Sequence, residues 1–303
     1  MRWIKKKKLF DLEKTSQLIY SHASNPVPVH LKDDIFRVFF SSRNALNQSS
    51  VSYVDVDIIK ERVVEFEGKI IHQFGPKGSF FADGISVGDV YSIKNQSYML
   101  FMGWQSEGLN HWRGDIGRFK LINNSELELN PIRPFMGIEP PNDLISLSYP
   151  FVLYDDGIYK MWYGSTLDWT SENGEMIHSI NYATSIDGEK WDRKGIAIDY
   201  QIGVAQAFSK PTIIKKNGIY HMWYSFRSGD GTPYRIGYSN SEDGIKWNNF
   251  FNESGISVSE TGWDSQMVCY PYVFSHKNEI YMLYNGNEYG KKGFGLAKLK
   301  ETV

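Results

Sequence analysis

The 303-residue sequence has a single cysteine, Cys269, no long hydrophobic run and no excess of charge of either sign. One cysteine excludes an internal disulfide, and the lack of a nearby His or Asp in the sequence favours a packed thiol over a reactive one. No apolar segment approaches the roughly 20 residues of a transmembrane helix. The 33 basic and 35 acidic residues are evenly scattered, whereas binding of a phosphate backbone needs a concentrated basic face. We therefore expect neither a membrane nor a nucleic acid among the partners.

Motifs for targeting, metals and cofactors are equally sparse. Residues 1–10 have no apolar segment of the signal-peptide type, which together with the single cysteine predicts a cytoplasmic protein. The only basic run, residues 5–8, is interpreted as a solvated chain end. The seven histidines are dispersed without metal-ligand spacing, and no glycine-rich phosphate loop is present, so neither a metal nor a cofactor is predicted. The oligomeric state is left open.

A short aromatic and aliphatic segment, Tyr-Lys-Met-Trp-Tyr-Gly in its plainest form, occurs five times at an almost constant spacing. The copies begin at residues 36, 98, 159, 220 and 281, so that successive offsets are 62, 61, 61 and 61 residues. Unrelated strands would not keep such a spacing. The regularity therefore indicates an internal repeat.

Nine or ten residues before each copy lies a second repeated position, which is proline in four of the five repeats. These positions are Pro26, Asp89, Pro150, Pro211 and Pro271. Proline fits the first residue of a strand, and residues 156–157 and 217–218, Asp-Gly and Asn-Gly, are typical of tight hairpins. Each repeat is therefore predicted to begin with a β-hairpin.

Two repeats add the motif Ser-X-Asp-Gly-X-X-Trp at 185–191 and 241–247, and further short strands are expected at 195–198 and 255–258. Antiparallel sheets of three or four strands repeated around an axis are the blades of a β-propeller. The predicted fold is an all-β, five-bladed β-propeller in which residues 1–303 form one domain. The blades are expected at about 24–73, 80–130, 145–200, 204–258 and 263–300, with an N-terminal strand at 9–20 completing the last one.

The residues just before the proline column are expected to converge near the axis of the propeller, so they are the first place to look for chemistry. Asp83, Asp89 and Asp264 are the carboxylates expected there. Asp83 and Asp264 are predicted to act as acid and base with Asp89 orienting them, although each is equally compatible with a turn or a cap. Neighbouring Lys and Arg side chains favour an anionic ligand. The candidate binding residues are Trp104, Arg113, Tyr149, Lys210, Arg227, Arg235, Asn285 and Asn287.

The repeated Met-Trp-Tyr-(Gly/Ser) strand and the Ile-X-Tyr-(Ala/Ser)-X-Ser-X-Asp-Gly-X-X-Trp segment that follows it resemble the five-bladed propellers of the glycosidase superfamily. This superfamily includes glycoside hydrolase families 43, 32, 68 and 130. The likeness covers nearly the whole chain. Residues 83–90, 263–271 and 284–287 are also similar to uncharacterised propellers that tend to occur among bacterial surface-polysaccharide genes.

The resemblance to families 43, 32 and 68 implies a carboxylate just before the proline of the first blade, an aspartate at the matching place in the third, and a glutamate two residues before the proline of the fourth. These positions fall on Asn25, Tyr149 and Ser209. The usual triad is therefore absent, whereas glycoside hydrolysis needs paired carboxyl groups about 5 to 9.5 Å apart.

Three hypotheses remain open. The first is a glycosidase-like carbohydrate-active enzyme that acts on a glycosyl bond of an anionic or nucleotide-linked sugar, in bacterial polysaccharide biosynthesis. The second is a non-catalytic propeller that binds a sugar or a nucleotide sugar. The third is a scaffold that contacts other proteins through its rim loops. The sequence leaves the sugar and the linkage undetermined.

Overall fold

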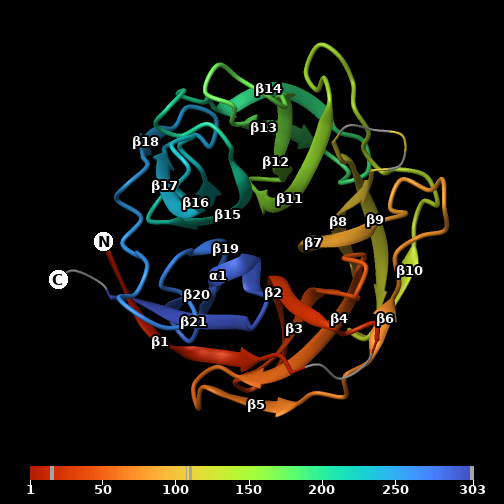
Figure 1. Cartoon of the computed structure of the whole chain (residues 1–303), viewed down its shortest axis with the longest axis vertical. Coiled ribbons are helices and arrows are strands. Elements are labelled where there is room, and N and C mark those ends of the chain that lie inside the picture. Colours follow the sequence, from red (N-terminus) through yellow and green to blue (C-terminus); the bar gives the residue numbers. More distant parts are fainter. Residues whose placement is uncertain (14–16, 107, 109–110, 301–303) are drawn as a thin grey trace.

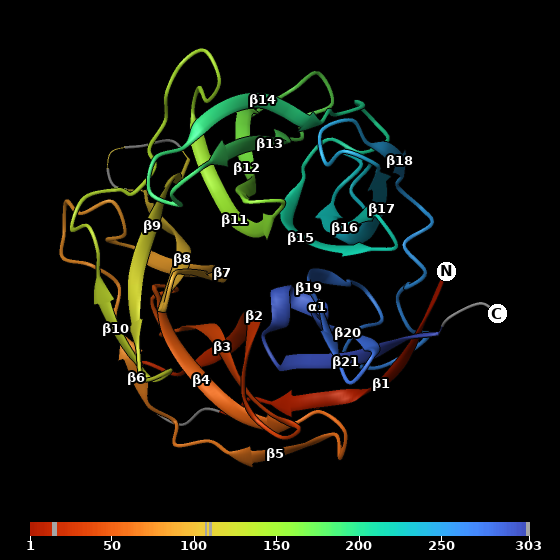
Figure 2. The same cartoon turned by 180° about the vertical axis from the view of Figure 1, so that it is seen from behind.

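The computed structural model describes residues 1–13, 17–106, 108 and 111–300, and their regular structure is almost entirely β-strand (Figure 1). Sheets of antiparallel strands are arranged in a ring around a common centre, and the chain passes from each sheet to the next in sequence order. The same ring is seen from behind in Figure 2. The prediction of an all-β propeller is thereby confirmed. Residues 14–16, 107 and 109–110, which fall within the predicted closing segment and the second predicted blade, lie outside the described residues.

Strand pairing gives three four-stranded sheets and one nine-stranded sheet. Within the nine-stranded sheet, β4 and β7 share only one parallel bridge, Ser49 with Gly84, and the strand pairs on either side are antiparallel. We therefore treat its two parts separately and number the resulting sheets 1 to 5 in chain order.

The bounds of the strands are as follows. Sheet 1 contains β2 (Ser21–Lys32), β3 (Ile35–Arg43), β4 (Ser49–Asp57), β5 (Arg62–Glu65) and β6 (Ile70–His72), and sheet 2 contains β7 (Gly84–Ile93), β8 (Gln96–Gln105), β9 (Arg113–Ile122) and β10 (Glu126–Leu129). Sheet 3 contains β11 (Ser146–Asp155), β12 (Ile158–Asp168), β13 (Ile177–Ser185) and β14 (Asp192–Ile198), and sheet 4 contains β15 (Ser209–Lys216), β16 (Ile219–Phe226), β17 (Arg235–Ser241) and β18 (Asn248–Phe250). Sheet 5 contains β19 (Cys269–His276), β20 (Glu279–Asn285), β21 (Gly293–Lys300) and β1 (Arg2–Asp11), with the short helix α1 (Asn287–Gly290) between β20 and β21.

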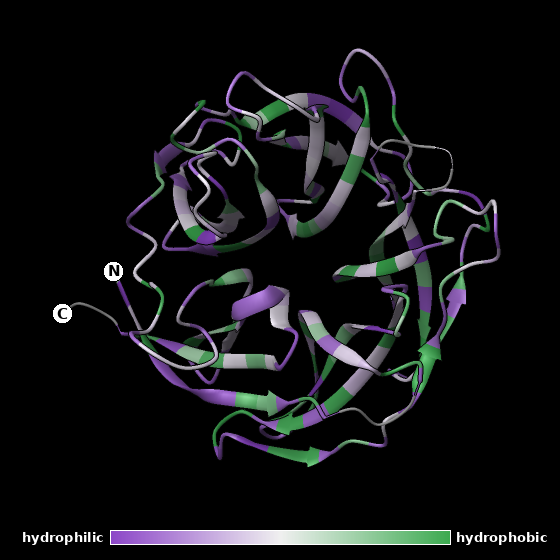
Figure 3. Ribbon diagram, viewed as in Figure 1, coloured by the Kyte–Doolittle hydropathy of each residue, from purple (hydrophilic) through white to green (hydrophobic). Residues whose placement is uncertain are grey.

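The repeated aromatic segments lie on the second strand of each sheet and are buried along most of their length. They are buried on both faces because neighbouring sheets pack against each side, so hydrophobic and hydrophilic residues are interleaved along the ring instead of forming one apolar side (Figure 3). Aromatic side chains also join the sheets. Tyr91 of sheet 2 donates to the carbonyl of Gly188 in sheet 3 at 3.0 Å, and Trp162 of sheet 3 donates to the carbonyl of Gly244 in sheet 4 at 3.2 Å. The repeated Asp-Gly turns thus serve as docking points for the preceding sheet.

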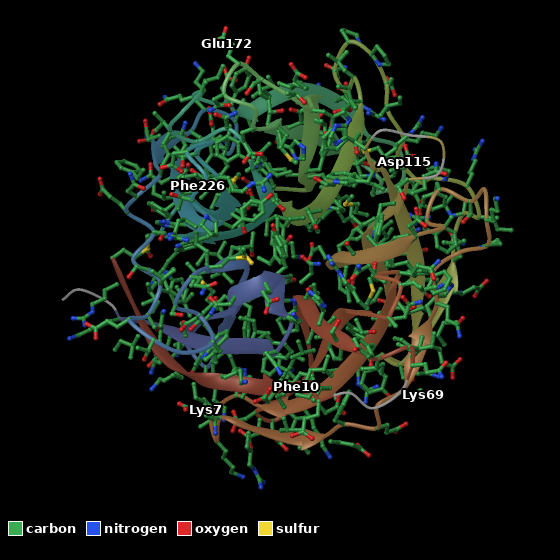
Figure 4. All side chains as sticks on the ribbon, viewed as in Figure 1. Lys7, Phe10, Lys69, Asp115, Glu172 and Phe226 are labelled. Atoms are coloured by element: carbon green, nitrogen blue, oxygen red, sulfur yellow. The ribbon has the colours of Figure 1, made fainter. Side chains whose placement is uncertain are left out.

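The N-terminal strand closes the ring, as predicted, because β1 pairs antiparallel with β21 of the last sheet. It starts at Arg2, however, and not near residue 9, so the interpretation of residues 5–8 as a solvated chain end is wrong. Lys5 Nζ lies 2.6 Å from Asp264 Oδ2, and the exposed Lys7 lies on the outer edge strand (Figure 4), where lysines hinder edge-to-edge pairing. Phe10 packs between sheets 1 and 5, with its ring 5.5 Å from those of Phe40 and Phe294.

The predicted strand at 195–198 falls within β14, but residues 255–258 do not form a strand. In their place the outermost strand of sheet 4 is β18, and the carbonyl of Gly255 accepts a hydrogen bond from the backbone N–H of Trp3 at 2.9 Å. This contact ties sheet 4 to the strand that closes the ring. Among the described residues, none of the helical structure has the length and apolar character needed to span a bilayer.

Candidate functional site

The innermost strand of every sheet has a break in its pairing register at the same place. The breaks lie between Ser24 and Val27, Val87 and Asp89, Ser148 and Phe151, Ser209 and Thr212, and Cys269 and Tyr272. The prolines therefore sit at bulges inside these strands, and the prediction that they begin the strands is wrong. Bulges accommodate proline because the local ladder bond is already missing.

In four of these bulges the residue before the proline has a left-handed backbone. The φ angles are 56° at Asn25, 40° at Tyr149, 54° at Lys210 and 53° at Tyr270. Such angles are unfavourable for residues other than glycine and persist only where the surrounding structure enforces them, often at functional sites. Here the two flanking ladders enforce them. The repeated bulge thus redirects side chains at the centre of the ring.

A cavity of about 230 Å³ lies at this centre. The inner strands of sheets 2 to 5 contribute Ser86, Tyr149, Ser209 and Tyr270, and Arg43 enters from the end of β3. Aromatic side chains dominate its walls: Trp104, Trp112, Tyr149, Tyr234, Tyr270 and Tyr289. Its polar lining consists of Arg43, Arg227, His178, Ser86 and Ser209. No carboxylate is among the described residues that line it.

The aromatic side chains form two groups. Tyr270 is central to the first, with its ring 5.5 Å from that of Tyr149 and 6.0 Å from that of Tyr234. In the second group the ring of Trp112 lies 5.8 Å from that of His178. Trp104 is fixed by a 3.1 Å hydrogen bond from its Nε1 to Ser49 Oγ. The cavity therefore offers broad apolar faces held in fixed positions.

The two arginines differ in how they are bound. Arg227 Nη2 pairs with Glu175 at 2.7 Å, and its guanidinium lies 5.0 Å from the centre of the Tyr234 ring, but its buried Nε has no hydrogen-bond partner among the described residues. The guanidinium of Arg43 has neither a hydrogen bond nor an ion pair with any described residue. Positive charge is thus available at the cavity wall.

Two further polar groups line the cavity in a form suited to an incoming ligand. Ser209 is 2% exposed, and its Oγ has no hydrogen-bond partner among residues 1–13, 17–106, 108 and 111–300. Burial, assisted by the charge of Arg227, lowers the pKa of His178 to about 3. The imidazole is therefore neutral at physiological pH, and it does not add to the positive charge.

The three carboxylates predicted as catalytic residues do not meet in this cavity. Asp83 Oδ2 accepts hydrogen bonds from the backbone N–H and the hydroxyl of Ser106, both at 2.6 Å. Asp264 is buried in sheet 5, between Lys5 and the hydroxyl of Tyr284, which lies 3.0 Å away. Asp89 is buried beneath the cavity and accepts from Tyr272 at 2.6 Å. Their predicted acid–base pairing therefore has no geometric support.

Of the predicted binding residues, Trp104, Tyr149 and Arg227 line the cavity, and the other five do not. Lys210 Nζ donates to the carbonyl of Gly88 on the opposite side of the ring, and Arg113 pairs with Asp115 at 3.3 Å. Arg235 donates to three backbone carbonyls.

Asn285 and Asn287 hold loops near the same centre. The Asn285 amide bonds to Ala23, Asn25 and Gly293, which joins sheets 5 and 1. Asn287 Oδ1 accepts from the backbone N–H groups of Gln266 and Met267. These side chains use their hydrogen-bonding groups within the protein.

Sequence reasoning missed several lining residues, among them Arg43, His178, Ser209, Tyr234, Tyr270 and Tyr289. Ser209 and Tyr270 were within reach, because they occupy the positions just before the proline column. Arg43 and His178 lie outside the repeated segments and carried no signal. Among the described residues there is no group of three or more His, Cys, Asp or Glu side chains placed to hold a metal ion.

No family model matches the chain. Over 302 residues it is 35% identical to the uncharacterised proteins MT1551 and Rv1502 of two Mycobacterium tuberculosis strains, in alignments that cover 99% of this chain and 100% of each relative. Neither relative has an assigned activity in its name.

Solved structures with the same fold are glycosidase-like. A glycoside hydrolase superposes with a TM-score of 0.75 at 14% identity, covering 99% of this chain and 93% of the other. A complex of BT0996 with RGII gives 0.77, 14%, 99% and 93%. The GH32 β-fructofuranosidase BmSUC1 of Bombyx mori gives 0.67 at 11% identity and covers 92% of this chain and 62% of the enzyme. At these identities the likeness shows a glycosidase-like propeller fold alone.

Proposed function

Because this protein belongs to the family of the M. tuberculosis proteins MT1551 and Rv1502 and has a glycosidase-like propeller fold, we propose that its central cavity binds an anionic carbohydrate. One observation carries the proposal: two arginines and no carboxylate are among the described residues that line the cavity. The whole chain has a formal charge of −2, so this local excess of positive charge is a property of the site.

The cationic groups are suited to a carboxylate or a phosphate. A guanidinium presents a planar fork of donors that matches both anions, and hydrogen bonds between charged groups are about twice as strong as neutral ones. Arg43 has no competing partner among the described residues. Arg227 Nε and Ser209 Oγ add two buried polar groups whose hydrogen bonds are unmade, and a ligand oxygen that met them would remove the cost of leaving them unpaired.

The rest of the wall is suited to a sugar ring. Trp104, Trp112 and Tyr270 present aromatic faces, and apolar walls with a few placed polar groups are typical of small-molecule sites. A volume of about 230 Å³ is below the roughly 300–1,000 Å³ of sites that enclose drug-sized ligands. The size favours one acidic sugar residue over an entire nucleotide sugar. The RGII complex among the structural neighbours adds support for a carbohydrate ligand.

Hydrolysis by two carboxylates has no residues to perform it in this cavity. The positions at which the glycosidase resemblance implies an aspartate and an acidic glutamate hold Tyr149 and Ser209, which line the cavity. The proposal therefore takes up the binding hypothesis and the anionic ligand, and leaves Asp83 and Asp264 out of the site. A cytoplasmic location and a role in polysaccharide biosynthesis stay predictions of the sequence.

Titration calorimetry with matched sugars tests this proposal. Galacturonate and galactose differ in a carboxylate at one carbon, as do glucuronate and glucose, and we expect binding of the acidic member of at least one pair without binding of its neutral counterpart. Arg43→Gln should weaken this binding about 10- to 100-fold, since a hydrogen bond to a charged group contributes about 1.5–3 kcal/mol.

Arg62→Gln is the matched control, because Arg62 is exposed on β5 and lies outside the cavity. It should leave the affinity unchanged. Equal affinity for acidic and neutral sugars, or an unaltered affinity in Arg43→Gln, would contradict the proposal.

A further inference from the structure

Two tyrosines stand side by side at the cavity wall, next to the arginine that has no partner. The rings of Tyr149 and Tyr270 are 5.5 Å apart, and both residues line the cavity. They occupy equivalent bulges of sheets 3 and 5, where left-handed backbone conformations hold them in place. Arg43 is close enough for its charge to act on the Tyr149 hydroxyl. The arrangement joins two proton-carrying groups and one cation.

The two hydroxyls have different surroundings. Burial raises the pKa of Tyr149, but hydrogen-bonding contacts with Tyr270 and Ser86 and the charge of Arg43 oppose the rise. All three opposing groups favour negative charge on the Tyr149 oxygen. Burial raises the pKa of Tyr270 well above its ordinary value, and its contact with Tyr149 raises it further. Tyr149 is thus the better proton acceptor and Tyr270 the better donor, a division that equips two like groups for base and acid roles.

We propose that Tyr149 and Tyr270 catalyse β-elimination at a 4-linked uronate residue whose carboxylate is bound by Arg43. This inference rests on the proposed function, because the uronate is the anionic sugar of the cavity. Elimination requires a cation to acidify the proton next to the carboxylate, a base to remove that proton and an acid for the leaving oxygen. Unlike hydrolysis, it requires neither paired carboxylates nor an attacking water, and the cavity has the first set of groups and lacks the second.

The proposed step is balanced within these groups. The Tyr149 phenolate takes the C5 proton of the uronate, the C5–H electron pair forms the C4=C5 double bond, and the C4–O bond breaks. The departing oxygen takes the proton of the Tyr270 hydroxyl and leaves as the new end of the released oligomer. Tyr270 is then a phenolate and Tyr149 a phenol, and transfer of one proton across their contact restores the starting state. No oxidant, cofactor or water is consumed.

The assay separates elimination from hydrolysis and from binding alone. The full-length protein is incubated with 4-linked oligomers of galacturonate, glucuronate and mannuronate, and the conjugated double bond of the unsaturated product is followed by ultraviolet absorbance and by its vinyl proton in NMR. We expect unsaturated product from at least one oligomer. Loss of a general acid or base typically costs about 100- to 10,000-fold, so we expect Tyr149→Phe and Tyr270→Phe to lower the rate by at least about 100-fold, while each retains binding in calorimetry.

Two variants check the assignment. Tyr154→Phe is a matched control on the same strand, since Tyr154 is 60% exposed and lies outside the cavity; its rate should equal that of the wild type. Ser86→Ala tests the positioning of Tyr149. Because only deprotonated Tyr149 can act as the base, the rate should increase with pH, and loss of the Ser86 contact should shift that increase to higher pH.

The outcomes distinguish this inference from the proposed function. Binding of acidic sugars without unsaturated product from any of the oligomers overturns the elimination and leaves the binding proposal intact. New reducing ends without the double bond indicate hydrolysis and likewise overturn it. Unsaturated product at an unchanged rate in Tyr149→Phe overturns the assignment of the base. Absence of both binding and product overturns both proposals.

Discussion

At the residue scale, the centre of the ring retains the positions of a glycosidase site and changes their chemistry. Tyr149 and Ser209 stand where the resemblance implies carboxylates, and both line the cavity. Asn25 stands at the third position, is 2% exposed, and its Oδ1 has no hydrogen-bond partner among the described residues. The bulges still deliver these side chains to the centre. What they deliver is hydroxyl and amide groups, which makes the arginines the only charged lining among the described residues.

Asp264 provides a residue-scale prediction because its contacts are structural. It is 3% exposed and accepts from Lys5 and Tyr284. Asp264→Asn should lower the free energy of unfolding by about 1–3 kcal/mol, since one buried partner loses its charged acceptor. Urea denaturation measures the loss, and calorimetry should show unchanged affinity for the acidic sugar.

Asp83→Asn is the matched control, because Asp83 is only half-buried and its contacts are with Ser106 alone. It should change stability by less than about 0.5 kcal/mol. If Asp264→Asn abolished binding or turnover at unchanged stability, the role that the sequence predicted for this carboxylate would be supported, and its structural assignment here would be wrong.

The candidate site was predictable only where the repeat fixes the register. Tyr149 directly precedes a proline of the repeated column, and Trp104 and Arg227 directly follow aromatic strands, so the sequence placed all three near the centre. Arg43 ends β3 and His178 lies near the start of β13, in parts of the repeat whose sequences do not match. Asp264 was placed wrongly because its partner, Lys5, comes from a strand that the sequence did not show.

At the scale of elements, strand β1 holds the two ends of the chain together. Trp3 is 4% exposed, and its ring meets that of Trp223 edge-on at 5.5 Å. Trp3→Ala should reduce the free energy of unfolding by about 3–5 kcal/mol, the usual cost of removing a buried tryptophan. Urea denaturation is the measurement. Lys7→Ala, on the exposed outer side of the same strand, should cost less than about 0.5 kcal/mol, and a similar small loss for Trp3→Ala would mean that β1 adds little to closure.

Elements with a period of two could be predicted, and irregular ones could not. The hairpins of the repeat were predicted correctly: Asp155 pairs with Ile158, and Lys216 with Ile219, across the expected turns. The prolines were misplaced because a bulge tolerates proline as well as a strand end does, and sequence alone does not separate the two. Strand β1 was missed because four consecutive lysines conceal the buried Trp3 and Leu9 on either side of them.

At the scale of the whole molecule, one buried carboxylate links sheets across the centre of the ring. Asp89 of sheet 2 accepts from the Tyr272 hydroxyl of sheet 5 at 2.6 Å and from the Val152 N–H of sheet 3 at 2.8 Å. Lys210 of sheet 4 donates to the carbonyl of Gly88 and carries the charge nearest to Asp89. Four sheets thus meet at one buried polar cluster. This explains Asp89, which was predicted to orient catalytic groups, as a link between sheets.

The pair predicts a distinctive pH dependence of stability. Burial raises the pKa of Asp89 from 3.8 to about 6 and lowers that of Lys210 from 10.5 to about 7. Folded Asp89 therefore binds a proton that the unfolded state has released, so its contribution to stability falls as pH rises from about 4 to about 6. Folded Lys210 has lost a proton that the unfolded state still binds, so its contribution rises with pH from about 7 to about 10. Between these ranges both groups are charged and buried, which is the least favourable state.

The double variant Asp89→Asn/Lys210→Met supplies the reference for this dependence. We expect the free energy of unfolding of the wild type, minus that of the double variant, to pass through a minimum between about pH 6 and pH 7 and to increase on both sides, as measured by urea denaturation across the pH range. Lys210→Met alone should cost about 3–5 kcal/mol at neutral pH, because it leaves a buried carboxylate without its cation, and the double variant should recover part of that loss. A difference curve that is flat with pH, or single and double variants of equal stability, would show that the sheets are held together without this pair.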